Sequence, residues 1–293
     1  MSLDHKLALP TWRSLIFCPA NSERFIAKAH MRGADAIILD LEDSVALAEK
    51  ADARFGLQSA AKLVGQSGAD VLVRINREIG LAVEDIAAAI SLNVMGLVLP
   101  KIKGPEHIQL LSELVLAREL ELGMPIGHTH FVVLIETVAA LELVNSIAKA
   151  DSRVVALAIG GEDFATDMNA LPTVDSLYVA KMQGLYAARA ANILPVGVLG
   201  SVAGVDDLLA YEAMLKRSRD LGFACATCVH PSHVPILNAV FSPSPEELEQ
   251  ARRLIATYEE GISLGKGAVL FEGRMVDRPV AMRAYRLLER VSR

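Results

Sequence analysis

Carboxylates and one arginine follow short apolar runs along the chain. Arg74 lies inside DVLVRIN, Glu136 ends FVVLIE, and Asp163 follows VVALAIGG. A guanidinium inside an apolar run is costly to bury unless it meets an anion. Arg74 is therefore expected to bind a substrate carboxylate or to stabilise a developing oxyanion.

Glu136 and Asp163 end two consecutive apolar runs. Neighbouring parallel strands lie about 4.8 Å apart, so two carboxylates at their ends can share one cation. Oxygen ligands with open coordination positions suit Mg²⁺, and neither side chain is expected in the core. The alternative is that each acid only caps a helix or pairs with a lysine.

Two further groups of charged residues follow apolar runs. Asp40, Glu42 and Asp43 come after the second run, where alternate residues face opposite ways and their roles stay open. Lys101 follows Pro100 at the end of MGLVLPK. It is a possible Schiff-base lysine, although its position past the strand end argues against that role.

The elements that must position these residues alternate between strands and helices. Eight apolar runs are typical of strands covered on both faces: Arg13–Pro19, Asp35–Leu41, Asp70–Asn76, Met95–Lys101, Phe131–Glu136, Val154–Gly161, Ile193–Gly200 and Phe223–Pro231. Helical spacing appears in six intervening segments: Glu23–His30, Ala46–Val64, Leu81–Leu92, Glu106–Leu122, Val138–Ala150 and Asp206–Leu221. Consecutive βα units predict an α/β fold, a (β/α)₈ TIM barrel, with reactive groups at the C-terminal ends of the strands. A doubly wound open sheet is the competing fold, but the chain has neither GxGxxG nor GxxxxGK[ST].

We expect two regions, a barrel domain over residues 1–241 and a C-terminal extension over residues 242–293. The extension opens with a helix capped by Ser244, continues through a short glycine-interrupted strand, and ends with the amphipathic segment Pro279–Val291. Two apolar stripes exceed what a barrel needs: Leu254, Ile255, Tyr258 and Leu287, Leu288, Val291. The extension is therefore predicted to be a lid and an oligomer contact.

Composition excludes several classes of protein. The 293 residues are 52% hydrophobic and carry a net charge of −6 without a run of Lys or Arg, which argues against a nucleic-acid partner. Three cysteines cannot form a disulfide framework, so a cytoplasmic location is expected. The chain shows no signal peptide and no apolar run of about 18 residues, so no membrane partner is expected.

Several motifs occur together and in order: RSLIFCPA, GADAIILDLEDSV, AEKADAR, VLVRIN, LVLPK, LIETVAAL, LAIGGEDFATDM, VHPSHVPILNAVFSPSPEE and GRMVDRP. With them, the chain from Arg13 to about Arg290 resembles the citrate lyase β-subunit-like family. That family lies within the wider group of malyl-CoA and citramalyl-CoA lyases and HpcH/HpaI-type aldolases. The resemblance implies a Mg²⁺-dependent carbon–carbon lyase that assembles as a homotrimer or homohexamer.

The resemblance also implies roles at the metal. Glu136 and Asp163 would be the metal ligands, and Arg74 would face the substrate carbonyl or carboxylate. The cluster that holds metal-bound waters would be Asp40, Glu42 and Asp43.

Other positions are implied to bind substrate or move protons. Gly161 and Glu162 lie in the segment that would receive the oxo-acid carboxylate, and Phe17 and Lys28 match positions that contact coenzyme A. Asp277, in MVDRP, corresponds to an aspartate that reaches a neighbouring subunit's active site as acid and base. The alternative for Asp277 is the N-cap of the last helix.

Three segments depart from the family pattern, and one of them is the loop after Asn76, which is shorter than in malyl-CoA lyases. Ala20-Asn21-Ser22 follows the first strand where relatives that bind coenzyme A have an arginine, which here comes only at Arg24. The seventh run leaves through PVGVLGSVAG, where an aspartate is usual. The metal centre is therefore better supported than the thioester.

The predicted activity is cleavage of a 3-hydroxyacyl-CoA thioester of the citramalyl, malyl or citryl type into an acyl-CoA and a 2-oxo acid. Alternatives are a coenzyme A-independent aldolase on hydroxy-oxo acids and a malate or citramalate synthase-type condensation. A non-enzymatic scaffold has no need to bring Arg74, Glu136 and Asp163 together.

Overall fold

The computed structural model describes residues 9–201 and 207–289. The chain divides into two compact units, Met1–Phe241 and Ser242–Arg293, and each is considered by itself. Several residues of the sequence predictions lie outside the described residues: Val202, Ala203 and Gly204 in the seventh-strand exit, Asp206 at the start of a predicted helix, and Val291 in the last apolar stripe.

The first unit is built on a ring of parallel strands. The strands are β1 (Ser14–Pro19), β2 (Ala36–Asp40), β3 (Asp70–Arg74), β4 (Gly96–Leu99), β5 (His130–Ile135), β6 (Val154–Ile159), β7 (Leu194–Val196) and β8 (Ala226–Cys228). They form one eight-stranded sheet in the order β7-β6-β5-β4-β3-β2-β1-β8. A parallel bridge between Val196 and Cys225 joins β7 to the start of β8 and closes the ring. The predicted (β/α)₈ barrel is confirmed, and each strand overlaps its predicted run.

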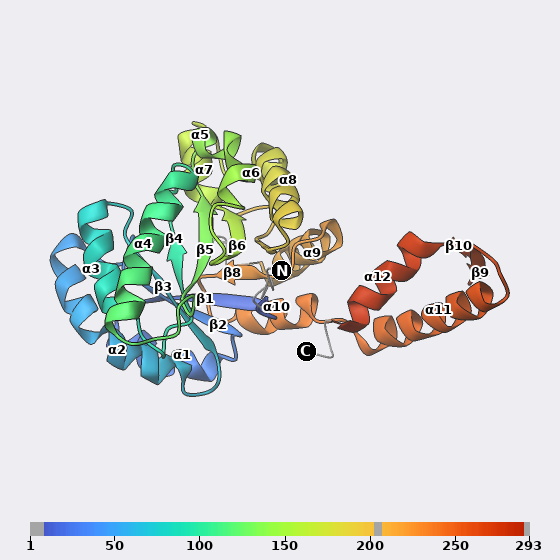
Figure 1. The fold of residues 1–293 in the computed structure, drawn as a ribbon, viewed down its shortest axis with the longest axis horizontal. Coiled ribbons are helices and arrows are strands. Elements are labelled where there is room, and N and C mark those ends of the chain that lie inside the picture. Colours follow the sequence, from blue (N-terminus) through green and yellow to red (C-terminus); the bar gives the residue numbers. More distant parts are fainter. Residues whose placement is uncertain (1–8, 202–206, 290–293) are drawn as a thin grey trace. The chain divides into compact units, whose positions relative to one another are not determined.

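Helices cover the outside of the strands, as Figure 1 shows. They are α1 (Glu23–Ala29), α2 (Lys50–Gly65), α3 (Ile79–Ala89), α4 (Pro105–Glu121), α5 (Val138–Glu142), α6 (Val144–Ile147), α7 (Gly161–Asp167), α8 (Val174–Ala191), α9 (Leu208–Leu221) and α10 (His233–Phe241), with 3-10 turns at His30–Arg32 and Leu47–Glu49. Among the described helices, none has both the length and the apolar character needed to cross a bilayer.

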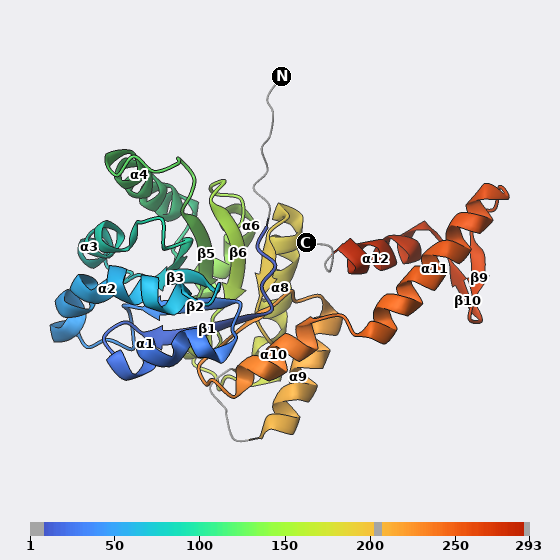
Figure 2. The same cartoon turned by 90° about the horizontal axis from the view of Figure 1, so that it is seen from below.

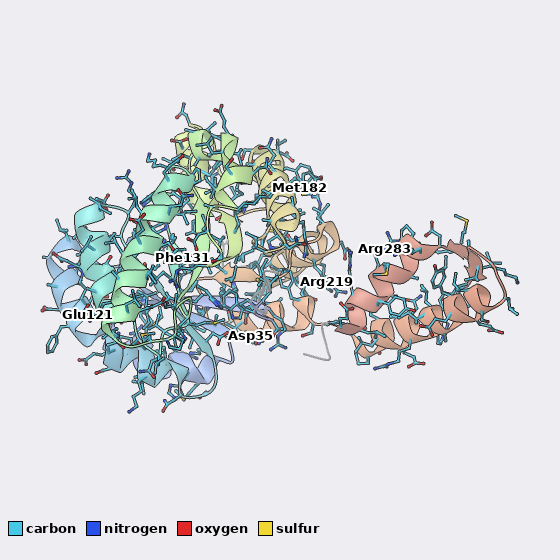
Figure 3. All side chains as sticks on the ribbon, in the orientation of Figure 1. Asp35, Glu121, Phe131, Met182, Arg219 and Arg283 are labelled. Atoms are coloured by element: carbon cyan, nitrogen blue, oxygen red, sulfur yellow. The ribbon has the colours of Figure 1, made fainter. Side chains whose placement is uncertain are left out.

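Alternation along the strands divides the core into two layers. On β2, Ile38 belongs to the cluster inside the barrel, whereas Ile37 and Leu39 belong to the larger cluster beneath the helices. Phe131 of β5, labelled in Figure 3, is fully buried in that larger cluster. These layers fix the strands and hence the direction of the residues at their ends.

The second unit contains α11 (Pro245–Ser263), β9 (Val269–Phe271), β10 (Arg274–Val276) and α12 (Arg278–Glu289). Ser244 caps α11 as predicted, because its side chain accepts a hydrogen bond from the Glu247 N–H. The β9–β10 hairpin joins α11 to α12 in the chain, and the two helices cross in the view of Figure 2. Apolar side chains from both helices pack together: Ala251, Leu254, Ile255, Ala284, Tyr285, Leu287 and Leu288. The two helices bury Ile255 and leave Leu254, Leu287 and Leu288 partly buried, so the contact of these stripes with another subunit stays a prediction.

Candidate active site

Arg74 meets the carboxylate of Asp40 at the C-terminal ends of β2 and β3. The parallel register places the two residues opposite each other. Arg74 Nε lies 2.6 Å from Asp40 Oδ1, and Nη2 lies 2.7 Å from Oδ2. Nη1 lies 3.0 Å from Glu42 Oε2. We predicted that this guanidinium meets an anion. In the structure that anion is the Asp40 carboxylate, which Arg74 contacts through two nitrogens in a bidentate pair.

Phe17 of β1 also contacts Arg74. The Arg74 Cζ atom lies 4.8 Å from the centroid of the Phe17 ring, which is the geometry of a cation–π contact. Arg74 is therefore held by two carboxylates at its edges and by an aromatic ring over its face.

Charge states at this site follow from burial and pairing. Burial lowers the pKa of Arg74, but the hydrogen bond to Asp40 and the negative charges of Asp40, Glu42 and Asp43 together outweigh it and leave the pKa above its usual value. Burial raises the pKa of Asp40, and the Arg74 pairing reverses this to a net lowering. For Glu42 the burial effect prevails over Arg74 and Lys101, so its pKa is raised. Arg74 and Asp40 are thus a fixed ion pair.

Two side chains, Asp40 and Lys50, hold the turn after β2 by hydrogen bonds to its main chain. Asp40 accepts hydrogen bonds from the N–H groups of Glu42 and Ser44, at 3.0 and 3.1 Å. The buried ammonium of Lys50 donates to the carbonyls of Leu41 and Glu42, at 2.6 and 2.8 Å. Lys50 therefore fixes the two carbonyl groups of this turn.

A second buried network supports the same turn. Asn76 donates through Nδ2 to the Leu41 carbonyl at 3.0 Å and to Asp85 Oδ2 at 2.7 Å. Asp85 is fully buried and also accepts from Arg54 Nε at 2.6 Å. Sequence reasoning missed these roles of Lys50, Arg54 and Asp85. The signal for two of them was the AEKADAR motif, which contains Lys50 and Arg54.

Glu136 follows β5 and is 5% exposed, so the expectation that it lies outside the core is wrong. Its Oε2 accepts a hydrogen bond of 2.6 Å from the Lys101 N–H. Burial raises the pKa of Glu136 to about 7, with the charges of Glu42 and Asp163 acting in the same direction. A Cβ atom on Gly160 would lie 2.6 Å from Glu136 Cγ and 2.8 Å from Oε1, so glycine is required beside this carboxylate.

Asp163 lies in the first turn of α7, directly after β6. Its Oδ2 is 3.6 Å from Lys101 Nζ. The same ammonium lies 2.9 Å from Glu42 Oε1 and 3.3 Å from Asp43 Oδ1. We use the term acidic mouth for the set Asp40, Glu42, Asp43, Arg74, Lys101, Glu136 and Asp163. Burial lowers the pKa of Lys101, but the Glu42 pairing outweighs it, and a lysine kept charged is unsuited to Schiff-base formation.

The segment predicted to receive an oxo acid lies at the start of α7. Glu162 forms a hydrogen bond with the Ser201 hydroxyl. Lys181 is buried close to Gly161, and its ammonium donates a hydrogen bond of 3.0 Å to the Gly200 carbonyl. Burial lowers the pKa of Lys181 to about 8, and Glu162 opposes this shift. The roles of Gly161 and Glu162 in substrate binding stay predictions.

Lys28 and Asp277 lie elsewhere in the chain. Lys28 is exposed in the last turn of α1, and its contact with coenzyme A stays a prediction. Asp277 belongs to the second unit, where its Oδ1 accepts a hydrogen bond of 3.3 Å from the Val280 N–H. That contact is the one expected of a helix N-cap. It is compatible with a further role in proton transfer, which stays a prediction.

The acidic mouth fits a magnesium ion with few protein ligands. Within residues 9–201 and 207–289, no three His, Cys, Asp or Glu side chains form a closed metal-binding cluster. Mg²⁺ in enzymes is usually held by one or two carboxylates, with waters and substrate completing the octahedron. Glu136 and Asp163 offer such oxygens, and the Lys101 ammonium already lies as a cation among the acids. The donor set therefore suits Mg²⁺.

The chain is similar to proteins of known activity over most of its length. The citrate lyase subunit beta of Leuconostoc mesenteroides subsp. cremoris is 33% identical over 282 residues, which cover 94% of this chain and 92% of that protein. The mitochondrial citramalyl-CoA lyase of Homo sapiens is 29% identical over 304 residues, covering 97% of this chain and 86% of that protein.

A solved structure shows the same fold. Protein CitE from Mycobacterium tuberculosis, in complex with magnesium, acetoacetate and coenzyme A, gives a TM-score of 0.75 at 28% identity. The match covers 98% of this chain and 100% of that one. Residues 13–231 match the description HpcH/HpaI aldolase/citrate lyase. The resemblance that the motifs indicated is thus confirmed, and the chain belongs to the HpcH/HpaI aldolase/citrate lyase family of carbon–carbon lyases.

Proposed function

We propose that this protein is a Mg²⁺-dependent lyase that cleaves a 3-hydroxyacyl-CoA thioester of the citramalyl, malyl or citryl type into an acyl-CoA and a 2-oxo acid. The observation that carries the proposal is that Glu136, Asp163 and Arg74 gather around Lys101 and Glu42. Lys101 contacts Glu136, Asp163 and Glu42, and Glu42 in turn contacts Arg74. The names of the relatives support a lyase acting on such thioesters, and the magnesium and coenzyme A bound to CitE support the cofactor and the thioester.

Each residue of the mouth has a task in this reaction. Bound at Glu136 and Asp163, Mg²⁺ would polarise the substrate's hydroxyl and carboxylate oxygens. Arg74, fixed by Asp40, stabilises the negative charge that develops on oxygen. The N–H groups at Gly161 and Glu162 receive the carboxylate of the oxo acid.

The bond changes balance without any further reactant. The substrate hydroxyl loses its proton, the neighbouring carbon–carbon bond breaks, and its electron pair passes to the thioester as an enolate. Asp277 of a neighbouring subunit carries the proton to the enolate carbon. The products are an acyl-CoA and a 2-oxo acid, and the same steps in reverse give a condensation.

A substrate panel tests the proposal. The protein is incubated with 3-hydroxyacyl-CoA thioesters, with pairs of acyl-CoA and 2-oxo acid, and with free hydroxy-oxo acids, and products are identified by mass spectrometry. We expect thioester cleavage that requires Mg²⁺ and stops after chelation with EDTA. Cleavage of the free acids alone would instead establish a coenzyme A-independent aldolase.

Variants assign the metal within the same assay. Glu136→Ala and Asp163→Ala are expected to abolish turnover because each removes a proposed ligand. Asp167→Asn is the control, since Asp167 lies on the same helix but accepts a hydrogen bond from the Val138 N–H at 2.7 Å. Full activity of the wild-type protein after complete chelation would refute the metal site.

A further inference from the structure

Lys101 has an unusual backbone for a long side chain. It follows β4 and Pro100 with a φ of 49°, in the left-handed region that such residues seldom adopt. A strained conformation of this kind persists only where the surroundings hold it. Here the resulting direction of the N–H group gives the 2.6 Å hydrogen bond to Glu136 Oε2.

The side chain of Lys101 reaches the other proposed ligand. Its ammonium lies 2.9 Å from Glu42 Oε1, 3.3 Å from Asp43 Oδ1 and 3.6 Å from Asp163 Oδ2. One residue thus contacts both proposed metal ligands, Glu136 through its main chain and Asp163 through its side chain. Its positive charge occupies the region that a divalent cation would seek.

We propose that Lys101 is an internal counter-cation that neutralises the acidic mouth before Mg²⁺ binds and leaves Asp163 when the metal arrives. This inference rests on the proposed metal site at Glu136 and Asp163. Once displaced, the ammonium keeps Glu42 and Asp43 as partners and stays beside the site. Lys101 therefore weakens Mg²⁺ binding, by competing for Asp163 and by repelling the ion, and acts as a positioning residue.

Coulomb's law gives the size of the effect. A unit charge and a divalent cation about 5 Å apart repel each other, even at the dielectric constant of water, by enough to change affinity about tenfold. Salt reduces this repulsion and the partial burial of Lys101 increases it. Removing the charge should consequently strengthen metal binding, which is opposite to the effect of removing a ligand.

Metal binding without substrate provides the test. Lys101→Gln and Lys101→Asn both remove the charge, and the short amide of Asn suits the left-handed backbone. By calorimetric titration with Mg²⁺, both variants are expected to show a Kd about tenfold lower than the wild type. Their Tm should be lower than wild type without metal and should rise more when Mg²⁺ is added.

Two controls separate charge from position. Lys101→Arg keeps the charge and should bind Mg²⁺ no more tightly than the wild type. Lys103→Gln removes an exposed lysine two positions along the same loop and should change the Kd by less than about twofold.

The outcomes distinguish this inference from the function on which it rests. If Asp163→Ala binds Mg²⁺ as tightly as the wild type does, the metal site and the inference are overturned together. If binding depends on Asp163, and folded Lys101→Gln and Lys101→Asn bind Mg²⁺ with unchanged or weaker affinity, only the role of Lys101 is overturned.

Discussion

Arg74 is the residue whose chemistry the structure defines most closely. Its planar fork uses two nitrogens on Asp40 and a third on Glu42, a pattern that a single ammonium cannot reproduce. Arg74→Lys is therefore expected to lower kcat/KM at least a hundredfold, or about 2.7 kcal/mol of transition-state stabilisation. Steady-state kinetics on the active thioester measures this loss.

Arg153→Lys is a matched control for this variant. Arg153 pairs through two nitrogens with buried Glu119, at 2.8 and 2.7 Å, just before β6 begins and so at the other end of the strand from Asp163. This substitution should lower stability while leaving kcat/KM close to wild type. If Arg74→Lys behaves in the same way as Arg153→Lys, Arg74 serves only to hold Asp40.

The sequence was informative about residue types but not about their partners. Arg74, Glu136 and Asp163 could be singled out because each is a charged residue at the end of an apolar run. That Asp40 takes two guanidinium nitrogens depends on the β2–β3 register, which the sequence does not show. The left-handed backbone of Lys101 could not be predicted either, because glycine is the residue that usually adopts this conformation.

The β6–α7 junction leads to a steric prediction. Gly160 has a φ of −67°, which alanine adopts readily, so the cost of Gly160→Ala comes from contact rather than from backbone strain. The added Cβ would lie 2.6 Å from Glu136 Cγ and must displace that side chain. We expect a loss of Mg²⁺ affinity of at least about tenfold, measured by titration. Gly80→Ala is the control, since its Cβ would meet no atom within 4 Å.

Lys181 on α8 leads to a prediction about pH. Burial lowers its pKa to about 8 in the folded protein, below the ordinary value of 10.5, so folding disfavours its proton. The resulting penalty is complete below pH 8 and disappears as the pH rises towards 10.5. At pH 7, Lys181→Met is expected to be more stable than wild type by about 2 kcal/mol, after allowing for the lost hydrogen bond to Gly200.

Urea unfolding at pH 7, 8.5 and 10 measures the effect. The advantage of Lys181→Met should shrink across this series, whereas Lys62→Met, at an exposed position of α2, should show no such trend. A difference between Lys181→Met and wild type that stays constant with pH would contradict the prediction.

The sequence predicted a strand or helix correctly where a single pattern of apolar residues dominated the segment. The strands were predictable because short runs of branched apolar residues suit only positions buried on both faces. Val138–Ala150 reads as one helix, but the chain leaves helical geometry at Leu143, where ψ is 5°, and forms α5 and α6. α8 was not among the predicted segments, although a capping box at Thr173 and Ser176 marks its start.

At the scale of the whole molecule, the second unit exposes a further apolar surface besides the predicted stripes. Its two helices partly bury Leu254 and Leu287 in the cluster that they share. Among the described residues of this unit, the large apolar side chains that remain exposed are Ile262, Leu264, Leu270, Met275 and Met282. Two of them, Leu270 and Met275, lie on the β9–β10 hairpin and pair with each other across it. We propose that this hairpin face contacts another subunit of a homotrimer or homohexamer.

Asp277 lies directly after that hairpin, so an assembly that covers the hairpin also places Asp277 at a subunit boundary. Asp277→Asn separates its two possible roles, because asparagine keeps the cap on the Val280 N–H but cannot carry a proton. We expect this variant to keep its Tm and lose turnover. Mixing it with inactive Glu136→Ala under subunit exchange should restore part of the activity, since one kind of mixed interface joins an intact Glu136 to an intact Asp277. Absence of rescue despite demonstrated exchange, or a fully active monomer in ultracentrifugation, would leave Asp277 with the helix cap alone.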